Sequence, residues 1–103
     1  MDVVPGQLVK SLQGRDKGNH YLVIGFEGER VLLADGRGRS VDRPKKKNPK
    51  HLQPYRCVSD GIKEIIRQGK LSDTELRNIL NTFLMGNTVY CPDYLRNPSE
   101  SGS

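Results

Sequence analysis

The chain has 103 residues, of which 34% are hydrophobic and 28% are charged. This size and composition favour one domain with a modest core, and they exclude a large multidomain enzyme and a fully disordered chain. No apolar run approaches the roughly 18 residues of a membrane span, and the N-terminus lacks the basic and apolar segments of a secretory signal. We therefore expect a cytoplasmic protein that does not bind membranes.

Positive charge is concentrated in the first half of the chain. The net charge is +5, and residues 1–56 contain 12 Lys or Arg against 6 Asp or Glu, whereas residues 57–103 contain 5 against 6. The densest segment, residues 37–50, has seven cations: Arg37, Arg39, Arg43, Lys45, Lys46, Lys47 and Lys50. Because its Pro and Gly residues favour an extended, exposed chain, this segment is interpreted as a surface for a polyanion, with a solvated loop as the alternative.

Short strands and turns are expected in this first half. Apolar patterns predict strands near residues 7–12, 20–26 and 30–35. Asp35-Gly36 is a hairpin signal, with a further strand expected at Arg39-Ser40-Val41. Several short strands separated by glycine turns predict a small barrel or sandwich.

Two of these strands are apolar on consecutive residues, at 21–24 and 31–34. A strand with one wet face would alternate between apolar and polar residues, so both faces of these strands are expected to be covered. A small barrel buries only its interior. Another part of the chain must therefore cover the exterior.

The second half has the signals of two helices, near residues 60–68 and 73–85. Gly69 is placed to end the first helix, and Ser72 with Glu75 forms a capping box for the second, which Gly86 would close. An apolar stripe follows on the second helix: Leu76, Ile79, Leu80, Phe83 and Leu84. We expect a helical hairpin packed on the barrel exterior, with contact to another protein as the alternative.

No pattern of catalytic or metal-binding residues is found. The two cysteines, Cys57 and Cys91, and the two histidines, His20 and His51, lack the close pairs of a zinc site. Cys57 and Cys91 could form a disulfide, but free thiols are expected in a reducing compartment. Since paired catalytic carboxylates, a phosphate-loop lysine motif and a nucleophile elbow are absent from the sequence, we expect a non-enzyme without metal or cofactor.

One motif resembles a known family. Gly14-Arg15-Asp16-Lys17-Gly18, here called the glycine turn, follows a segment that begins at Gly6 and precedes an apolar strand, as in the KOW motif. The Ala34-Asp35-Gly36 turn and the segment Arg43-Pro-Lys-Lys-Lys-Asn-Pro-Lys-His-Leu52 are similar to those of the KOW-containing RNA-binding proteins of bacteria. That group is related to archaeal and eukaryotic large-subunit ribosomal proteins. The resemblance covers roughly residues 4–84.

The resemblance implies an α+β fold, with a small SH3-like β-barrel of the KOW type at residues 4–56 and a helical hairpin at 57–86. Residues 87–95 depart from it, and residues 87–103 are expected to be irregular or flexible. The implied function is binding of structured RNA, with ribosomal RNA and the large ribosomal subunit as the expected partner. The expected contact residues are Arg15, Lys17, Arg37, Arg39, Arg43, Lys45, Lys46, Lys47 and Lys50 for phosphates, with His51 and Tyr55 as the favoured residues for stacking on bases.

His20 and Tyr21 are weaker stacking candidates, because Tyr21 lies in an apolar strand. The alternative function is a protein-interaction module that binds a partner protein through the barrel or the helical hairpin. The sequence leaves the oligomeric state open.

Overall fold

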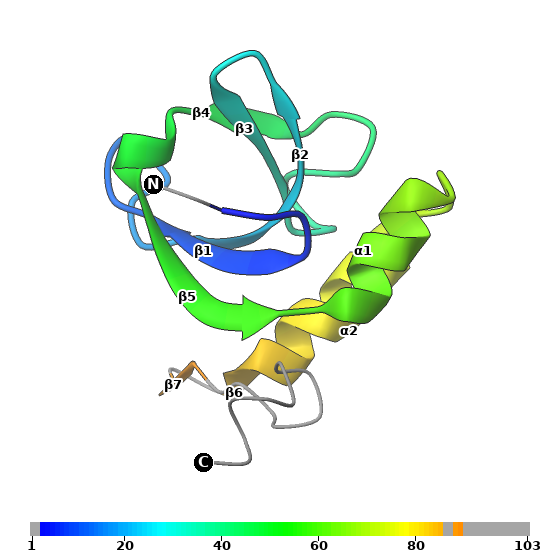
Figure 1. Cartoon of the computed structure of the whole chain (residues 1–103). Helices are drawn as coiled ribbons and strands as arrows, with labels where there is room; N and C mark the ends of the chain where they lie inside the picture. Colours follow the sequence, from blue (N-terminus) through cyan, green and yellow to red (C-terminus); the bar gives the residue numbers. More distant parts are fainter. Residues whose placement is uncertain (1–2, 86–87, 90–103) are drawn as a thin grey trace, which may run out of the picture.

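The computed structural model describes residues 3–85 and 88–89. A five-stranded antiparallel sheet has the order β4-β3-β2-β1-β5 and curls on itself, as in a small barrel (Figure 1). The strands are β1 (Gln7–Ser11), β2 (His20–Glu27), β3 (Arg30–Ala34), β4 (Lys45–Lys47) and β5 (Leu52–Val58). The edge strands β4 and β5 are joined by a short 3-10 helix, η1 (Pro49–His51).

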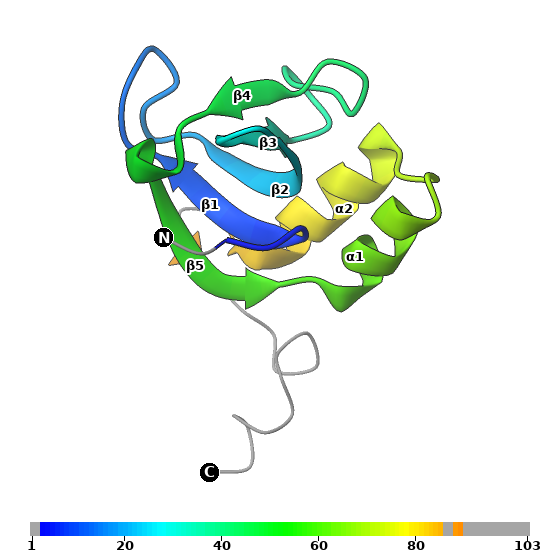
Figure 2. The ribbon, with the colours of Figure 1, turned by 45° about the horizontal axis from the view of Figure 1, so that its top comes forward.

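Two helices follow the sheet, α1 (Asp60–Arg67) and α2 (Asp73–Phe83), and they lie beside one another on one side of it (Figure 2). Ser59 caps α1 by accepting a hydrogen bond from Ile62 N at 3.2 Å. Ser72 caps α2 by accepting one from Glu75 N at 3.2 Å. After α1, Gly69 has a φ of 69°, a left-handed conformation that glycine adopts without strain. The prediction of an α+β fold with two C-terminal helices is confirmed.

The sheet separates two apolar clusters, because successive side chains of a strand point to opposite faces. One cluster lies on the face around which the sheet curls and contains Val3, Val9, Tyr21, Val23, Val31, Leu33 and Leu52. The other lies between the sheet and α2 and contains Leu8, Leu22, Ala34, Cys57, Leu76, Leu80 and Phe83. The continuous apolar runs of β2 and β3 are thereby explained, and the helical stripe packs on the chain's own sheet, as expected.

The end of α2 differs from the prediction. The helix expected to reach residue 85 ends at Phe83, because Leu84–Met85 (β6) pairs with Thr88–Val89 (β7). Those two residues of β7 belong to the segment expected to be irregular. Gly86, Asn87 and residues 90–103, including the expected flexible tail, lie outside the described residues.

The strand expected at Arg39-Ser40-Val41 is absent as well. The amide of Val41 donates to Asp73 Oδ1 of α2 at 2.8 Å instead of to a neighbouring strand. The partner of β3 is β4, in which Lys47 pairs with Val31 and Lys45 with Leu33. The hairpin from β3 therefore has a long connection rather than a tight turn.

Cys57 is fully buried in the cluster between sheet and helix, and it is disulfide-bonded rather than a free thiol. The expectation of a free thiol at this position is therefore wrong. The second cysteine of the sequence, Cys91, is not among the described residues. In the part of the chain that the structure describes, no helix is long and apolar enough to cross a membrane.

Leu80→Glu tests whether the α2 stripe is core. Leu80 is only 6% exposed, so the substitution places a carboxylate in an apolar cluster, and we expect a loss of at least about 3 kcal/mol in unfolding free energy. Urea denaturation followed by circular dichroism measures this loss. Asn78→Glu, on the exposed side of the same helix, is the control and should stay near wild type. A wild-type denaturation curve for Leu80→Glu would show that the stripe is not core.

Candidate nucleic-acid interface

The glycine turn between β1 and β2 directs its acidic residue inward and its basic residues outward. Gly14 and Gly18 both have a φ of 94°, in the region that favours glycine. A Cβ on Gly14 would also lie 3.3 Å from Asp16 Oδ1, which leaves little room for a side chain. The Asp16 side chain is only 10% exposed, whereas Arg15 and Lys17 are exposed.

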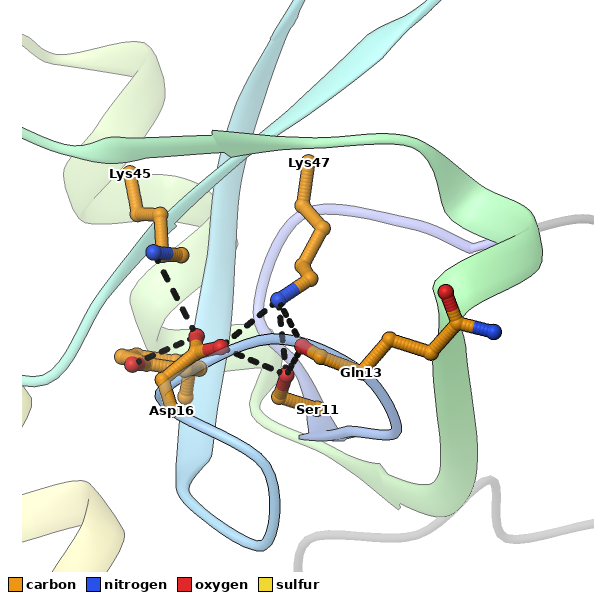
Figure 3. Close-up of polar contacts among 6 residues, drawn as sticks. Ser11, Gln13, Asp16, Lys45 and Lys47 are labelled. Atoms are coloured by element: carbon orange, nitrogen blue, oxygen red, sulfur yellow. Dashed lines mark hydrogen bonds and ion pairs between the residues drawn. The ribbon is translucent and has the colours of Figure 1, made fainter.

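Asp16 is the centre of a polar network that links β4 to the glycine turn (Figure 3). Lys47 Nζ of β4 donates to Asp16 Oδ1 at 2.7 Å, to Ser11 Oγ at 2.8 Å and to the carbonyl of Gln13 at 2.6 Å. The hydroxyls of Ser11 and Tyr21 each donate to Asp16, to Oδ1 and Oδ2 respectively, at 3.0 Å. The two oxygens of Asp16 and the ammonium group of Lys47 are thus fully engaged inside the protein.

The pKa of Asp16 reflects these contacts. Burial alone would raise the pKa, but the hydrogen bonds from Lys47, Ser11 and Tyr21, with the charge of Lys45, lower it to about 2. Lys45 Nζ lies 3.6 Å from Asp16 Oδ2. Asp16 is therefore ionised at neutral pH, and its charge is balanced mainly by Lys47.

Lys47 therefore has a structural role. The sequence alone does not distinguish it from Lys45 and Lys46, which are expected to contact phosphates. It is 9% exposed and all three donors of its ammonium group have partners, so we remove it from the candidate contact residues. Tyr21 is 2% exposed and its hydroxyl is hydrogen-bonded to Asp16, in agreement with its place in an apolar strand. Neither side chain is free to meet a ligand.

A second turn, residues 35–39 after β3, presents two arginines; we call it the arginine turn. Asp35 Oδ1 accepts hydrogen bonds from the amides of Arg37 and Arg39, both at 2.9 Å. The amides of Asp35 and Gly36 donate to the carbonyl of Arg39. The Arg37 and Arg39 side chains are exposed, and within residues 3–85 and 88–89 their guanidinium groups make no hydrogen bond or ion pair.

The two turns meet at a pair of neighbouring open pockets, which share Asn19 and Asp35. One pocket, of about 320 Å³, is lined by Arg15, Arg39 and Lys45. The other, of about 310 Å³, is lined by Arg37 together with His20 and Leu80. We call the four cations Arg15, Arg37, Arg39 and Lys45 the arginine face. They come from the glycine turn, the arginine turn and β4.

The remaining predicted cations line neither pocket. Lys46 is held by Glu27 in an exposed ion pair of 2.9 Å. Lys17 is exposed in the glycine turn beside the arginine face. Arg43 is exposed in the connection between β3 and β4, and Lys50 is exposed within η1. The basic segment is therefore not one continuous surface, because alternate residues of β4 point in opposite directions.

The aromatic candidates His20, Tyr55 and His51 lie on β2, β5 and η1. Tyr55 of β5 packs against His20 of β2, with ring centroids 5.7 Å apart and 3.4 Å between Tyr55 Oη and His20 Nε2. Burial, and then the positive charge of Lys10, lower the pKa of His20, which favours a neutral ring. His51 lies in η1, half-buried, where its carbonyl accepts a hydrogen bond from Leu12 N.

Two site residues were missed by sequence reasoning. Asn19 and Asp35 line both pockets, and Asp35 also organises the arginine turn. The Asp35-Gly36 pair was identified only as a turn signal. Among the described residues, no group of three or more His, Cys, Asp or Glu side chains is arranged to hold a metal ion.

The chain matches no model of a known protein family, and a search of curated proteins finds no matching sequence.

The low pKa of Asp16 predicts acid sensitivity. Its pKa is about 2 in the folded protein against an ordinary value of 3.8, so folding favours the charged form. This stabilisation is present above about pH 5 and is lost as the pH falls toward 2. Urea denaturation at several pH values should show this loss, and Asp16→Asn should reduce it. Asp42→Asn, at an exposed carboxylate, is the control, and equal pH dependence in both variants would contradict the assignment.

Lys47→Met and Lys46→Met should differ sharply in stability. Lys47→Met leaves Asp16 buried without its main partner, which costs about 3–5 kcal/mol, whereas the exposed pair of Lys46 contributes at most about 1 kcal/mol. We expect the melting temperature to fall by more than about 10 °C for Lys47→Met and by a few degrees at most for Lys46→Met. Similar melting temperatures for the two variants would refute the structural role of Lys47.

Proposed function

We propose that the protein binds structured RNA through the arginine face, with ribosomal RNA of the large subunit as the target. The observation that carries this proposal is the convergence of four cations from separate segments on two adjoining pockets. The two acidic side chains that line these pockets are already engaged, Asp16 by Lys47 and Asp35 by the backbone of its own turn. Lys47 balances the charge of Asp16, and the four cations of the arginine face outnumber the remaining carboxylate, Asp35, so the face keeps a net positive charge.

The chemistry of the face suits phosphates on a nucleic-acid backbone. A guanidinium group is planar and donates two parallel hydrogen bonds to a phosphate, and it remains charged at any physiological pH. Phosphate contacts position a protein on RNA without reading its sequence. Aromatic residues make up only 6% of the chain, so a stacking platform for long single strands is not favoured.

The glycine turn, with its inward Asp16 and outward Arg15 and Lys17, joins β1 and β2. This arrangement supports the resemblance of the sequence to the KOW motif. We propose that the curled five-stranded sheet is an SH3-like barrel of the KOW type, in a non-enzymatic cytoplasmic protein that associates with the ribosome.

The alternative of a protein-interaction module is less well supported. The helical stripe packs against the sheet and is not available to a partner, since Leu76, Leu80 and Phe83 are all buried. Binding of an acidic protein to the arginine face would use the same cations. Nuclease treatment distinguishes the two functions, because it destroys a complex with RNA and leaves a complex with an acidic protein intact.

RNA affinity should depend steeply on salt. If the arginine face and neighbouring Lys17 neutralise about five phosphates, the slope of log affinity against log salt concentration is about −3.5 to −4.5. Fluorescence anisotropy with a labelled RNA stem-loop, measured over a series of KCl concentrations, gives this slope. A slope near zero contradicts the proposal.

The double substitution Arg37→Gln/Arg39→Gln should weaken binding at least about tenfold and make the slope shallower by about 1.5 to 2. The matched control is Lys46→Gln/Arg67→Gln, which removes the same charge from two exposed sites outside the arginine face. Equal weakening by both pairs would indicate that only net charge matters, and would refute a localised face.

A further inference from the structure

We propose that Asp73 and Arg77 of α2 are positioning residues for the arginine turn, so that the helical half of the chain helps to form the RNA-binding surface. The inference rests on the proposed function, because it concerns the same surface. The arginine turn lies in the connection between β3 and β4, yet α2 holds this connection at Gly36, inside the turn, and at Val41, two residues beyond it.

The first attachment is at Gly36. Arg77 Nη1 donates a hydrogen bond of 2.6 Å to the carbonyl of Gly36, and Arg77 Nη2 donates to Thr74 Oγ1 on its own helix at 3.2 Å. Gly36 is buried and has a φ of 76°. A Cβ at Gly36 would collide with the carbonyl oxygen of Asp73 and come within 3.0 Å of Arg77 Cγ, so the turn and the helix are in direct contact.

The second attachment is at Val41, beyond the two arginines. Its amide donates to Asp73 Oδ1 at 2.8 Å. Asp73 is the first residue of α2, directly after the cap Ser72, so its position is fixed by the start of the helix. The chain between Gly36 and Val41 is therefore anchored at both ends, and Asp35 orders the amides between them.

These attachments order the backbone that carries Arg37 and Arg39 before any ligand arrives. A surface that is ordered in advance loses less conformational freedom when it binds, and its affinity is correspondingly higher. Arg77 therefore uses its charge on a backbone carbonyl rather than on a ligand. Asp73 contributes although its charge is repulsive to RNA.

The sign of the Asp73 effect makes the proposal testable. Asp73→Ala and Glu75→Ala each remove one carboxylate from the first turn of α2, and neither removes the Ser72 cap. If charge alone acted, both variants would bind RNA slightly more tightly. Positioning by Asp73 predicts that Asp73→Ala binds the RNA stem-loop about fivefold more weakly, whereas Glu75→Ala does not weaken binding.

The second pair is Arg77→Gln and Arg67→Gln, which remove equal charge from α2 and α1. Arg67 is exposed and paired with Glu64 at 3.3 Å. We expect Arg77→Gln to bind about fivefold more weakly than Arg67→Gln. Thermal unfolding of each variant establishes that the comparison is made between folded proteins.

Amide hydrogen exchange gives a readout that does not depend on RNA. The amides of Arg37 and Arg39 bond to Asp35, not to α2, so their exchange reports the order of the turn itself. We expect exchange at these two amides to accelerate at least about fivefold in Asp73→Ala and Arg77→Gln, and not in Glu75→Ala.

Unchanged exchange at Arg37 and Arg39 in both positioning variants would overturn the proposal. Asp73→Ala binding RNA like Glu75→Ala would also overturn it. If the wild-type protein does not bind RNA, the proposed function fails, and the exchange measurement still decides whether α2 orders the turn.

Discussion

The ion pair between Lys47 and Asp16 is the contact on which the candidate surface depends. β4 is an edge strand of three residues, and Lys47 extends from it to the turn after β1, where it bonds to Asp16, Ser11 and Gln13. A buried carboxylate requires such a partner, because an unpaired charge in this environment is strongly destabilising. The Lys47–Asp16 pair therefore attaches the edge strand β4 to the glycine turn and holds that turn in one conformation. With Asp16 directed inward, Arg15 and Lys17 are left on the outside of the same turn.

The arginine turn is also ordered by an acidic side chain, but there the carboxylate bonds to backbone amides instead of to a lysine. Asp35 accepts hydrogen bonds from two amides inside the turn. From α2, Arg77 bonds to Gly36 within the turn and Asp73 bonds to Val41 just beyond it. In both turns, acidic side chains are used to order the protein, and arginines that have no such role face solvent. The helical half thus has two structural roles. Its apolar side covers the sheet, and its first turns support the loop that carries Arg37 and Arg39.

Much of the fold could be predicted from local patterns, and the site only in part. The continuous apolar runs of β2 and β3 indicated that both faces are covered, and Ser72 and Gly69 marked helix ends that the structure retains. Long-range contacts were not predictable in this way. Nothing in three consecutive lysines shows that Lys47 becomes buried while Lys46 stays exposed, since this depends on the pairing of β4 with β3. Similarly, the hydrogen bond from Val41 to Asp73 joins residues 32 positions apart, and it replaces the strand that the local pattern favoured.

The most direct test of RNA binding in the cell is sedimentation of the tagged protein from lysate on a sucrose gradient, with and without nuclease. The wild type should migrate with the large ribosomal subunit or intact ribosomes, and high salt should release it. The Arg37→Gln/Arg39→Gln variant should remain at the top of the gradient, whereas Lys46→Gln/Arg67→Gln should migrate like the wild type. Wild-type protein that remains at the top under every condition would contradict ribosome association. Migration that survives complete nuclease digestion, in a complex with another protein, would contradict RNA as the partner.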